Sequence, residues 1–229
     1  VTSLVDDASY SSAVGHYPGS IPRVHADAET LLALEPDLVV VAPYSSPETV
    51  RVLVTAGVPV LRLFEGTTLD DIEASAELLS RAVGAHDGFV ALQDELRLAE
   101  RRNAQLPRFA APPRVLFLST DGYTHGTGTL MDDMLRAAGG VNVAASLHLH
   151  AHHRAPLEAI IEASPEVLLL PAPSDGEAIA TLERIAPLLR TALPHARVAS
   201  LPSRALETTT LEALQAIPQL HDAIARTRP

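Results

Sequence analysis

One helical pattern organises the chain around it: Asp87-Gly-Phe-Val-Ala-Leu-Gln-Asp-Glu-Leu-Arg-Leu-Ala-Glu-Arg-Arg-Asn-Ala-Gln-Leu106. Asp87 is a predicted N-cap, because its carboxylate suits the free N–H groups of a first helical turn. An apolar stripe recurs at helical spacing and consists of Phe89, Leu92, Leu96 and Ala99. Such a helix spans roughly 30 Å, about the width of a small domain, and Pro107 ends it. We expect a stiff connector between two similar lobes.

Apolar runs lie on both sides of this helix and alternate with helical patterns. The clearest runs are Val1–Val5, Asp37–Ala42, Val58–Phe64, Val115–Leu118 and Val167–Leu170. Continuous apolar runs of this length are typical of strands that are covered on both faces. Strands that alternate with helices predict parallel sheets with right-handed crossovers.

The predicted fold is therefore α/β, with two Rossmann-like lobes that have mostly parallel sheets and are joined by one long helix. Residues 1–86 are expected to form the N-terminal lobe, residues 87–106 the connecting helix and residues 107–229 the C-terminal lobe.

An internal repeat supports the two-lobed interpretation. Glu29–Val41 and Glu158–Leu170 each read as a short helix, a proline turn and a buried strand, in one register and 129 residues apart. The same offset relates Glu48 to Glu177, and both follow a Pro/Ser-rich loop. Each glutamate is expected in the first turn of a helix, where the helix dipole favours a carboxylate. This stabilisation of a helix start is by itself enough to account for a glutamate at either position.

The composition excludes several classes of function. The net charge of −11 argues against nucleic acid and anionic membrane surfaces as partners. The chain has no Cys and all 17 cationic side chains are Arg, which excludes cysteine nucleophiles, thiolate metal sites, Schiff-base lysines and a P-loop lysine. No apolar run approaches the roughly 20 residues that a transmembrane helix needs.

Enzymatic motifs are weak. Gly126-Thr-Gly128 resembles half of a dinucleotide fingerprint, but Met131 replaces the third glycine and no acid follows at the required distance. The adjacent acids Asp70-Asp71 and Asp132-Asp133 are interpreted as solvated or capping residues, because neighbouring helical residues do not face each other. We expect a binding protein rather than an enzyme.

A longer stretch carries a specific resemblance. It reads Gly126-Thr-Gly-Thr-Leu-Met-Asp-Asp-Met-Leu-Arg-Ala-Ala-Gly-Gly-Val-Asn-Val-Ala144 and follows the predicted long helix. Together with the two repeated helix-proline-strand units, it resembles the substrate-binding proteins of ABC importers for vitamin B12, haem and iron-siderophores. The resemblance covers nearly the whole chain.

The resemblance implies two lobes bridged by one rigid helix, with a ligand held between them and little hinge motion. It also implies one surface glutamate per lobe that docks onto arginine pockets of a dimeric permease, and Glu48 and Glu177 occupy the matching positions. The expected location is periplasmic or tethered to the outer face of the cell membrane. We expect the free protein to be a monomer that requires no cofactor.

The start of the chain departs from the family pattern. Family members usually have an additional strand and helix before the strand that corresponds to Val1–Val5. We expect that part of the ligand site therefore cannot be identified from this sequence, and that apolar surface is exposed on the first lobe.

Several candidate ligand-binding residues lie near predicted strand ends, where ligands of open α/β sheets bind. Tyr10, Tyr44 and Tyr123 each offer a flat face and a hydroxyl. His25 and His125 lie in corresponding loops of the two lobes. A late arginine suits a ligand carboxylate, namely Arg204. The alternative for each of these residues is that it is an exposed loop residue that contacts no ligand.

A histidine cluster lies beyond Gly139-Gly140. In an extended segment His148, His150 and His152 share one face, and neutral imidazoles bind Zn, Fe, Co or Cu. The spacing matches no closed zinc motif. The cluster is either a solvated loop, a contact to a bound metal chelate, or an adventitious metal site.

The predicted function is capture of a metal chelate for an ABC importer, with a corrinoid favoured over haem or a ferric siderophore. Haem-binding relatives use a Tyr just before the first repeated helix, whereas this chain has Pro22, Arg23 and His25 there. The rival from another class is a His-dependent metalloenzyme such as a chelatase, and a third candidate is a binder of free Zn or Mn.

Overall fold

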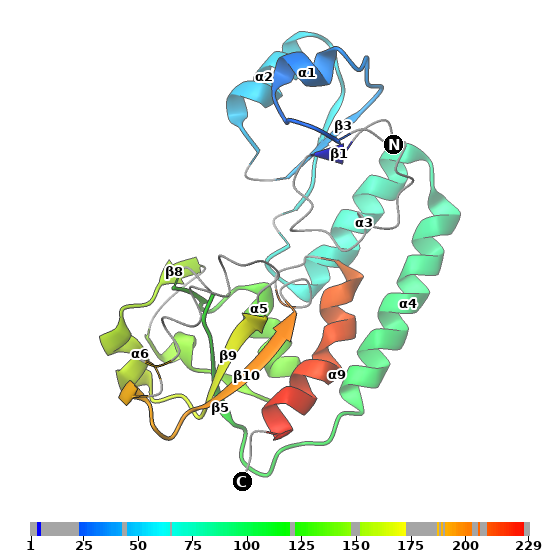
Figure 1. The fold of residues 1–229 in the computed structure, drawn as a ribbon. Coiled ribbons are helices and arrows are strands. Elements are labelled where there is room, and N and C mark those ends of the chain that lie inside the picture. The colour runs from blue at the N-terminus through cyan, green and yellow to red at the C-terminus, as the bar shows by residue number, and fades with distance from the viewer. Residues whose placement is uncertain are drawn as a thin grey trace. The chain divides into compact units, whose positions relative to one another are not determined.

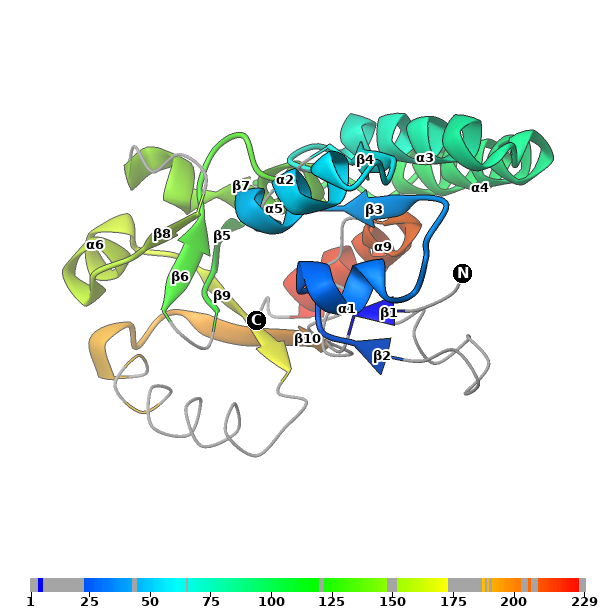
Figure 2. The ribbon, with the colours of Figure 1, turned by 90° about the horizontal axis from the view of Figure 1, so that it is seen from above.

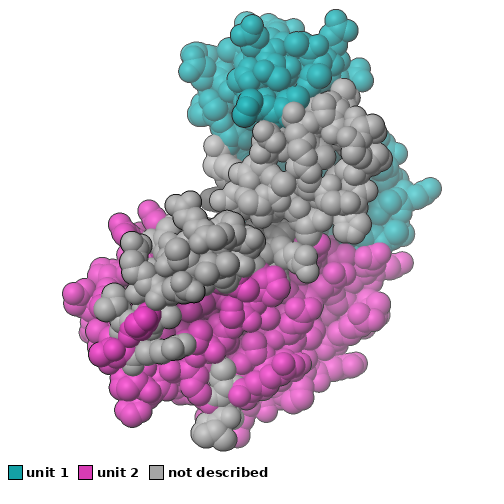
Figure 3. Space-filling model, in the orientation of Figure 1, with its two compact units in different colours: residues 1–66, 70–92 teal, residues 67–69, 93–229 magenta. Residues whose placement is uncertain are grey.

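The computed structural model describes residues 4–5, 23–42, 45–64, 66–119, 122–147, 152–172, 187, 189, 191–202, 206 and 210–226 of the 229 residues. The chain divides into two compact units, residues 1–66 with 70–92 and residues 67–69 with 93–229 (Figure 3). The lobe boundaries expected from the sequence stay a prediction. Among the described residues, no helix is long and apolar enough to cross a membrane.

The first unit contains two short pairs of parallel strands and the helices that connect them. Its elements are β1 (Leu4–Val5), β2 (Arg23–Val24), α1 (Ala28–Leu32), β3 (Val39–Val41), α2 (Pro47–Thr55), β4 (Val60–Arg62), α3 (Leu69–Val83) from Asp70 onward and the first part of α4 (His86–Ala104). β1 pairs with β2, and β3 pairs with β4. The parallel pairing confirms the α/β prediction for this part of the chain.

The second unit is built on a four-stranded parallel sheet. Its elements after α4 are β5 (Arg114–Phe117), β6 (Tyr123–His125), α5 (Leu130–Ala137), β7 (Val141–Asn142), the 3₁₀ helix η3 (Val143–Leu147), β8 (His152–Arg154), α6 (Leu157–Ala163), β9 (Val167–Ala172), β10 (Arg197–Pro202) and α9 (Leu211–Arg226). The strand order is β10-β9-β5-β7, and a separate antiparallel pair joins β6 to β8.

This strand order contains a topological switch point. The chain passes from β5 outward to β7, and then returns to place β9 on the other side of β5. The arrowheads of β9 and β10 point to the same edge of the sheet in Figure 1. Ligands of such sheets bind beyond the carboxyl ends of the strands next to the switch point. That edge, after β5, is therefore where a site is expected.

Helices cover both faces of the sheet. Leu116 of β5 and Leu168 of β9 belong to a buried cluster with Ile160 of α6. On the other face, Gly140 lies close to Val115 of β5 and Ile224 of α9, because a Cβ added there would be 3.1 Å and 3.5 Å from their side chains. Figure 1 shows α6 and α9 on opposite sides of the sheet. Burial on both faces accounts for the continuous apolar runs of β5 and β9.

The predicted long helix corresponds to α4. It begins at His86 rather than at the predicted N-cap Asp87, because Phe89 N already donates to Ala85 O at 3.1 Å, and Asp87 lies in the first turn. The apolar stripe faces inward, with Leu96 and Ala99 buried. The role of α4 as a connector of two lobes stays a prediction.

The repeated segments have the same unusual backbone. Glu35 has φ +47° and Ser164 has φ +43°, and they are the two non-glycine residues with positive φ in the described part of the chain. They lie 129 residues apart, and each stands between a short helix and the proline that precedes a strand. A left-handed conformation is uncommon for residues other than glycine. Its recurrence at this spacing confirms that the two segments adopt one local structure.

Two local elements are not apparent from the local sequence. The apolar segment after Val141 forms η3 rather than a longer strand, and β7 ends at Asn142. The glycine-rich segment that contains Gly122, Gly126 and Gly128 includes the strand β6. Pairing with β8 creates β6, and such long-range pairing has no signal in the local sequence.

Candidate functional site

The turn after β5 directs the chain back across the end of the sheet. Ser119 N donates to Tyr123 O at 2.8 Å, and Tyr123 N donates to Ser119 Oγ at 2.9 Å. Gly122 completes the turn with φ +85° and donates from its N–H to Ser119 O at 3.1 Å. Glycine suits this position because other residues rarely adopt such a φ. The turn places β6 at the switch-point edge.

Strand alternation then separates the side chains of β6. Thr124 is fully buried and donates from Oγ1 to Phe117 O at 2.7 Å. Tyr123 and His125 leave the strand on the opposite face. Tyr123 is 41% exposed, and the partly buried ring of His125 meets the ring of Phe117 edge-on, with centroids 4.8 Å apart. Tyr123 and His125, both predicted ligand-binding residues, therefore lie on the same face of β6.

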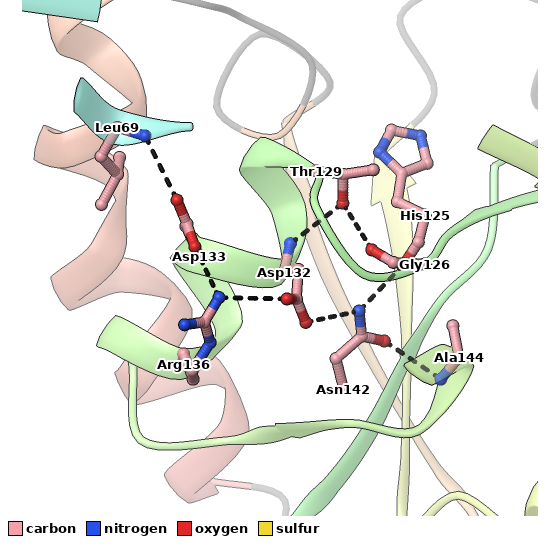
Figure 4. A network of polar contacts seen from close by, with 9 residues as sticks. All are labelled: Leu69, His125, Gly126, Thr129, Asp132, Asp133, Arg136, Asn142 and Ala144. Carbon is pink, nitrogen blue, oxygen red and sulfur yellow. Dashed lines mark hydrogen bonds and ion pairs between the residues drawn. The ribbon is translucent and has the colours of Figure 1, made fainter. Parts of the chain in front are cut away.

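A buried amide holds the backbone at His125. Asn142 Nδ2 donates to His125 O at 2.9 Å and to Asp132 Oδ1 at 3.0 Å, and its Oδ1 accepts from Ala144 N at 3.1 Å (Figure 4). Asn142 is 6% exposed and Asp132 is 9% exposed. Because these polar groups are buried and paired, they fix one arrangement of the loop that follows β6.

Thr129 fixes the other end of this loop. It is the N-cap of α5, where its Oγ1 accepts from Asp132 N at 3.3 Å and donates to Gly126 O at 2.8 Å. At the other terminus of α5, Gly140 N donates to Leu135 O and Gly139 N to Arg136 O, which is the hydrogen-bond pattern of a Schellman motif. The two glycines therefore end this helix.

The acidic pair Asp132-Asp133 differs from its predicted role. Asp132 is buried and accepts from Arg136 at 3.0 Å as well as from Asn142. Asp133 pairs with Arg136 at 2.6 Å and accepts from the backbone N–H of Leu69, the first residue of α3, at 3.3 Å. Asp132 is thus a structural acid rather than a solvated one. Arg136 lies at helical spacing from Asp132, but the buried partner Asn142 is ten residues away, so helical periodicity does not reveal it.

Other nominated residues belong to the first unit or to parts outside the described residues. His25 is exposed after β2. Glu48 lies in the first turn of α2, as predicted, with its carboxylate 3.9 Å from Arg51. The nominated residues that lie outside the described ones are Tyr10, Tyr44, His148, His150, Glu177 and Arg204.

The predicted metal cluster stays a prediction. His152 belongs to β8, where the backbone register pairs it with His125, while the other two members lie outside the described residues. Within the described ranges, no group of three His, Cys, Asp or Glu side chains could hold a metal ion.

Comparison with known proteins identifies the family. Residues 6–204 match the family model of the periplasmic binding proteins. The chain belongs to this family. A cobalamin-binding protein of Halobacterium salinarum is 29% identical over 146 residues, which are 62% of this chain and 40% of that protein. This periplasmic binding protein thus spans about 40% of the length of the curated relatives it matches.

Solved structures support the fold. The periplasmic haem-binding protein RhuT from Roseiflexus sp. RS-1 matches with a TM-score of 0.78 and 24% identity, covering 99% of this chain and 90% of that chain. The periplasmic vitamin B12 binding protein BtuF of Vibrio cholerae matches with a TM-score of 0.71 and 21% identity, covering 99% and 88%. The predicted family and the α/β fold with mostly parallel sheets are confirmed, and the family consists of binding proteins rather than enzymes.

Proposed function

We propose that this periplasmic binding protein is the substrate-binding component of an ABC importer and that its ligand is a metal chelate, with a corrinoid favoured. The observation that carries the proposal is the joint presentation of Tyr123 and His125 at the switch-point edge, on a strand fixed at both ends. The match to a cobalamin-binding protein over 62% of the chain favours the corrinoid.

The chemistry of these side chains suits a metal-bearing macrocycle. The exposed ring of Tyr123 offers a flat apolar face and a hydroxyl for a polar edge. The imidazole of His125 is a good ligand for Co or Fe. Because hydrogen bonds already order the backbone at both residues, binding loses little conformational entropy. The ligand is cargo, so no bond is made or broken during capture.

Haem or a ferric siderophore is the alternative ligand within the same class. The fold likeness to a haem-binding protein supports haem, and the likeness to a vitamin B12 binding protein supports a corrinoid. A His-dependent metalloenzyme such as a chelatase and a binder of free Zn or Mn remain the candidates from other classes. That the ligand lies between two lobes stays a prediction from the family resemblance.

Titration distinguishes these functions. Cyanocobalamin, haemin and Zn²⁺ are each titrated into the protein and followed by absorbance and calorimetry. We expect stoichiometric binding of the corrinoid, a spectral shift on binding, and no conversion of any chelate during prolonged incubation. Binding of Zn²⁺ alone would favour the free-metal carrier. Metal insertion or removal with turnover would favour the enzyme and would overturn the proposal.

In this proposal, the protein partner is the permease of the importer. Glu48 and Glu177 would contact the two halves of a permease dimer, and the protein would act in the periplasm or at the outer face of the cell membrane. Glu48 is suitably placed for such a role, because its carboxylate is 82% exposed at the start of α2.

A further inference from the structure

Arg154, at the end of β8, is an exposed arginine whose side chain makes no hydrogen bond or ion pair to another described residue. Arg101, Arg102 and Arg108 are likewise exposed and without such a contact in the described part of the chain, so what distinguishes Arg154 is its place beside Tyr123. Five other arginines are paired with carboxylates, namely Arg51, Arg81, Arg97, Arg136 and Arg226. Arg154 therefore keeps its positive charge available at the surface.

The backbone holds Arg154 at the switch-point edge. Strands β6 and β8 run side by side (Figure 2), and in this antiparallel pair Arg154 lies directly opposite Tyr123. Ala155 N donates to Gly122 O at 3.1 Å, which ties the end of β8 to the turn after β5. A Cβ added to Gly122 would lie only 3.8 Å from Arg154 Nε, so the arginine side chain lies over that turn.

Arg154 and Tyr123 are suited to act together. Directly opposite residues of an antiparallel pair have neighbouring side chains on one face of the strands. Alternation puts His125 on that same face, and the buried Thr124 on the other. A cation, a phenol and an imidazole therefore lie together beyond the end of β5.

We propose that Arg154 and the hydroxyl of Tyr123 form an anion-binding subsite for a carboxylate or phosphodiester group on the edge of the ligand. A planar guanidinium binds two oxygens of either group through paired N–H donors. The phenol adds a third donor beside them. This inference rests on the proposed function and specifies the ligand further, because a neutral chelate would leave the charge of Arg154 unused.

The charge of the whole chain strengthens this assignment. With a net charge of −11, the protein repels anions on average, so an anionic ligand needs a local positive group at the site. The exposed position of Arg154 means that salt screens the interaction, and affinity for the anionic group should fall with ionic strength.

Matched pairs of ligands test the subsite. Haemin carries two carboxylates that its dimethyl ester lacks, and cyanocobalamin carries a nucleotide loop with a phosphodiester that dicyanocobinamide lacks as a whole. In at least one pair, the wild-type protein should bind the member with the anionic group about 10-fold or more tightly, as charge-assisted hydrogen bonds allow. In the corrinoid pair, only the part of the preference that Arg154→Gln removes is assigned to the phosphodiester. The pair that shows the preference identifies whether a carboxylate or a phosphodiester occupies the subsite.

Three variants complete the test. Arg154→Gln should lower affinity for the ligand with the anionic group to about that for its counterpart, and Arg154→Lys should keep part of the preference. Arg101→Gln removes another exposed arginine of the second unit, in the last turn of α4, and should change neither affinity. Thermal unfolding confirms that each variant is folded.

The outcomes separate this inference from the proposed function. If the wild-type protein binds these chelates and Arg154→Gln keeps the full preference, or if neither pair shows a preference, the subsite is wrong and the proposed function survives. If the wild-type protein binds none of the four ligands, the proposed function is wrong and the subsite falls with it.

Discussion

Asn142 donates a hydrogen bond from Nδ2 to the carbonyl oxygen of His125 at 2.9 Å, across a sequence separation of 17 residues. The same amide group donates to Asp132 Oδ1 and accepts from Ala144 N. The side chain of Asn142 therefore ties the end of β6 to α5 and to η3. The position of His125 therefore depends on a residue that does not itself need to contact the ligand.

We predict that Asn142→Asp destabilises the second unit by about 2–3 kcal/mol, because a buried donor is replaced by a carboxylate oxygen that faces two acceptors. Urea unfolding measures the loss. Gln105→Glu makes the same chemical change at an exposed position and should alter stability by less than about 0.5 kcal/mol. Equal stability of the two variants would show that the hydrogen bonds of Asn142 contribute nothing.

Gly139 supports a second prediction, because its φ of +84° is suited to glycine and a Cβ added to it would lie 3.0 Å from a ring carbon of Phe109. That ring is stacked on His221 with centroids 4.7 Å apart, so it cannot move without disturbing α9. Gly139→Ala should cost at least about 1–2 kcal/mol from the left-handed backbone alone.

Gly88 provides the matched control for this substitution. It lies inside α4, and an added Cβ would have nothing within 4 Å. Gly88→Ala should therefore stabilise the protein by about 0.5–1 kcal/mol, since alanine is the better helix former. Thermal unfolding of both variants should give shifts of opposite sign, and shifts of the same sign would contradict the interpretation of either glycine.

The local structure of the chain could be predicted wherever the signal lay within a few residues. The apolar runs of β5 and β9, the stripe of α4 and the Gly139-Gly140 terminus each follow from spacing or from the backbone freedom of glycine. The repeat predicted one local structure in both halves, and the matching positive φ of Glu35 and Ser164 agrees with it.

The candidate site was predictable only in part, because its contacts join distant residues. Tyr123 and His125 were nominated from their place after a strand. The pairing of β6 with β8, which brings Arg154 opposite Tyr123, depends on register between segments 31 positions apart. Likewise, Asn142 and Asp132 are polar residues that become buried only through the folding of the second unit. Periodicity contains no information about either relationship.

The pH dependence of α1 follows from its N-cap. Asp27 accepts hydrogen bonds from the N–H and the hydroxyl of Thr30, each at 2.8 Å. These bonds, the backbone one first, lower the pKa of Asp27 below its ordinary value of 3.8. Because the folded pKa is the lower one, the capping stabilisation is complete above pH 3.8 and is lost as the pH falls through the folded pKa.

NMR titration tests this prediction. The side-chain carboxyl resonance of Asp27 should have a midpoint below 3.8, and the amide resonance of Thr30 should change with the same midpoint. In Asp27→Asn the cap keeps an acceptor but does not titrate, so the change at Thr30 should disappear. A change at Thr30 that persists in the variant would assign it to another group.

The last prediction concerns delivery to the importer. Glu48 is 82% exposed and meets only Arg51, at 3.9 Å, among the described ion pairs. Glu48→Ala should change stability by less than about 0.5 kcal/mol, because exposed ion pairs and helix-start acids each contribute little. Ligand affinity should also stay unchanged. Ligand-stimulated ATP hydrolysis by the reconstituted importer should fall, and fall further when Glu177→Ala is added.

A matched control distinguishes docking from a general effect of charge. Glu29 is an exposed acid in the first turn of α1, so Glu29→Ala removes the same charge from an equivalent local position. This variant should stimulate the importer like the wild-type protein. If Glu48→Ala together with Glu177→Ala still delivered ligand at the wild-type rate, neither glutamate could be the docking group, whatever the ligand is. If Glu29→Ala were equally impaired, the permease would be sensing overall charge rather than one carboxylate on α2.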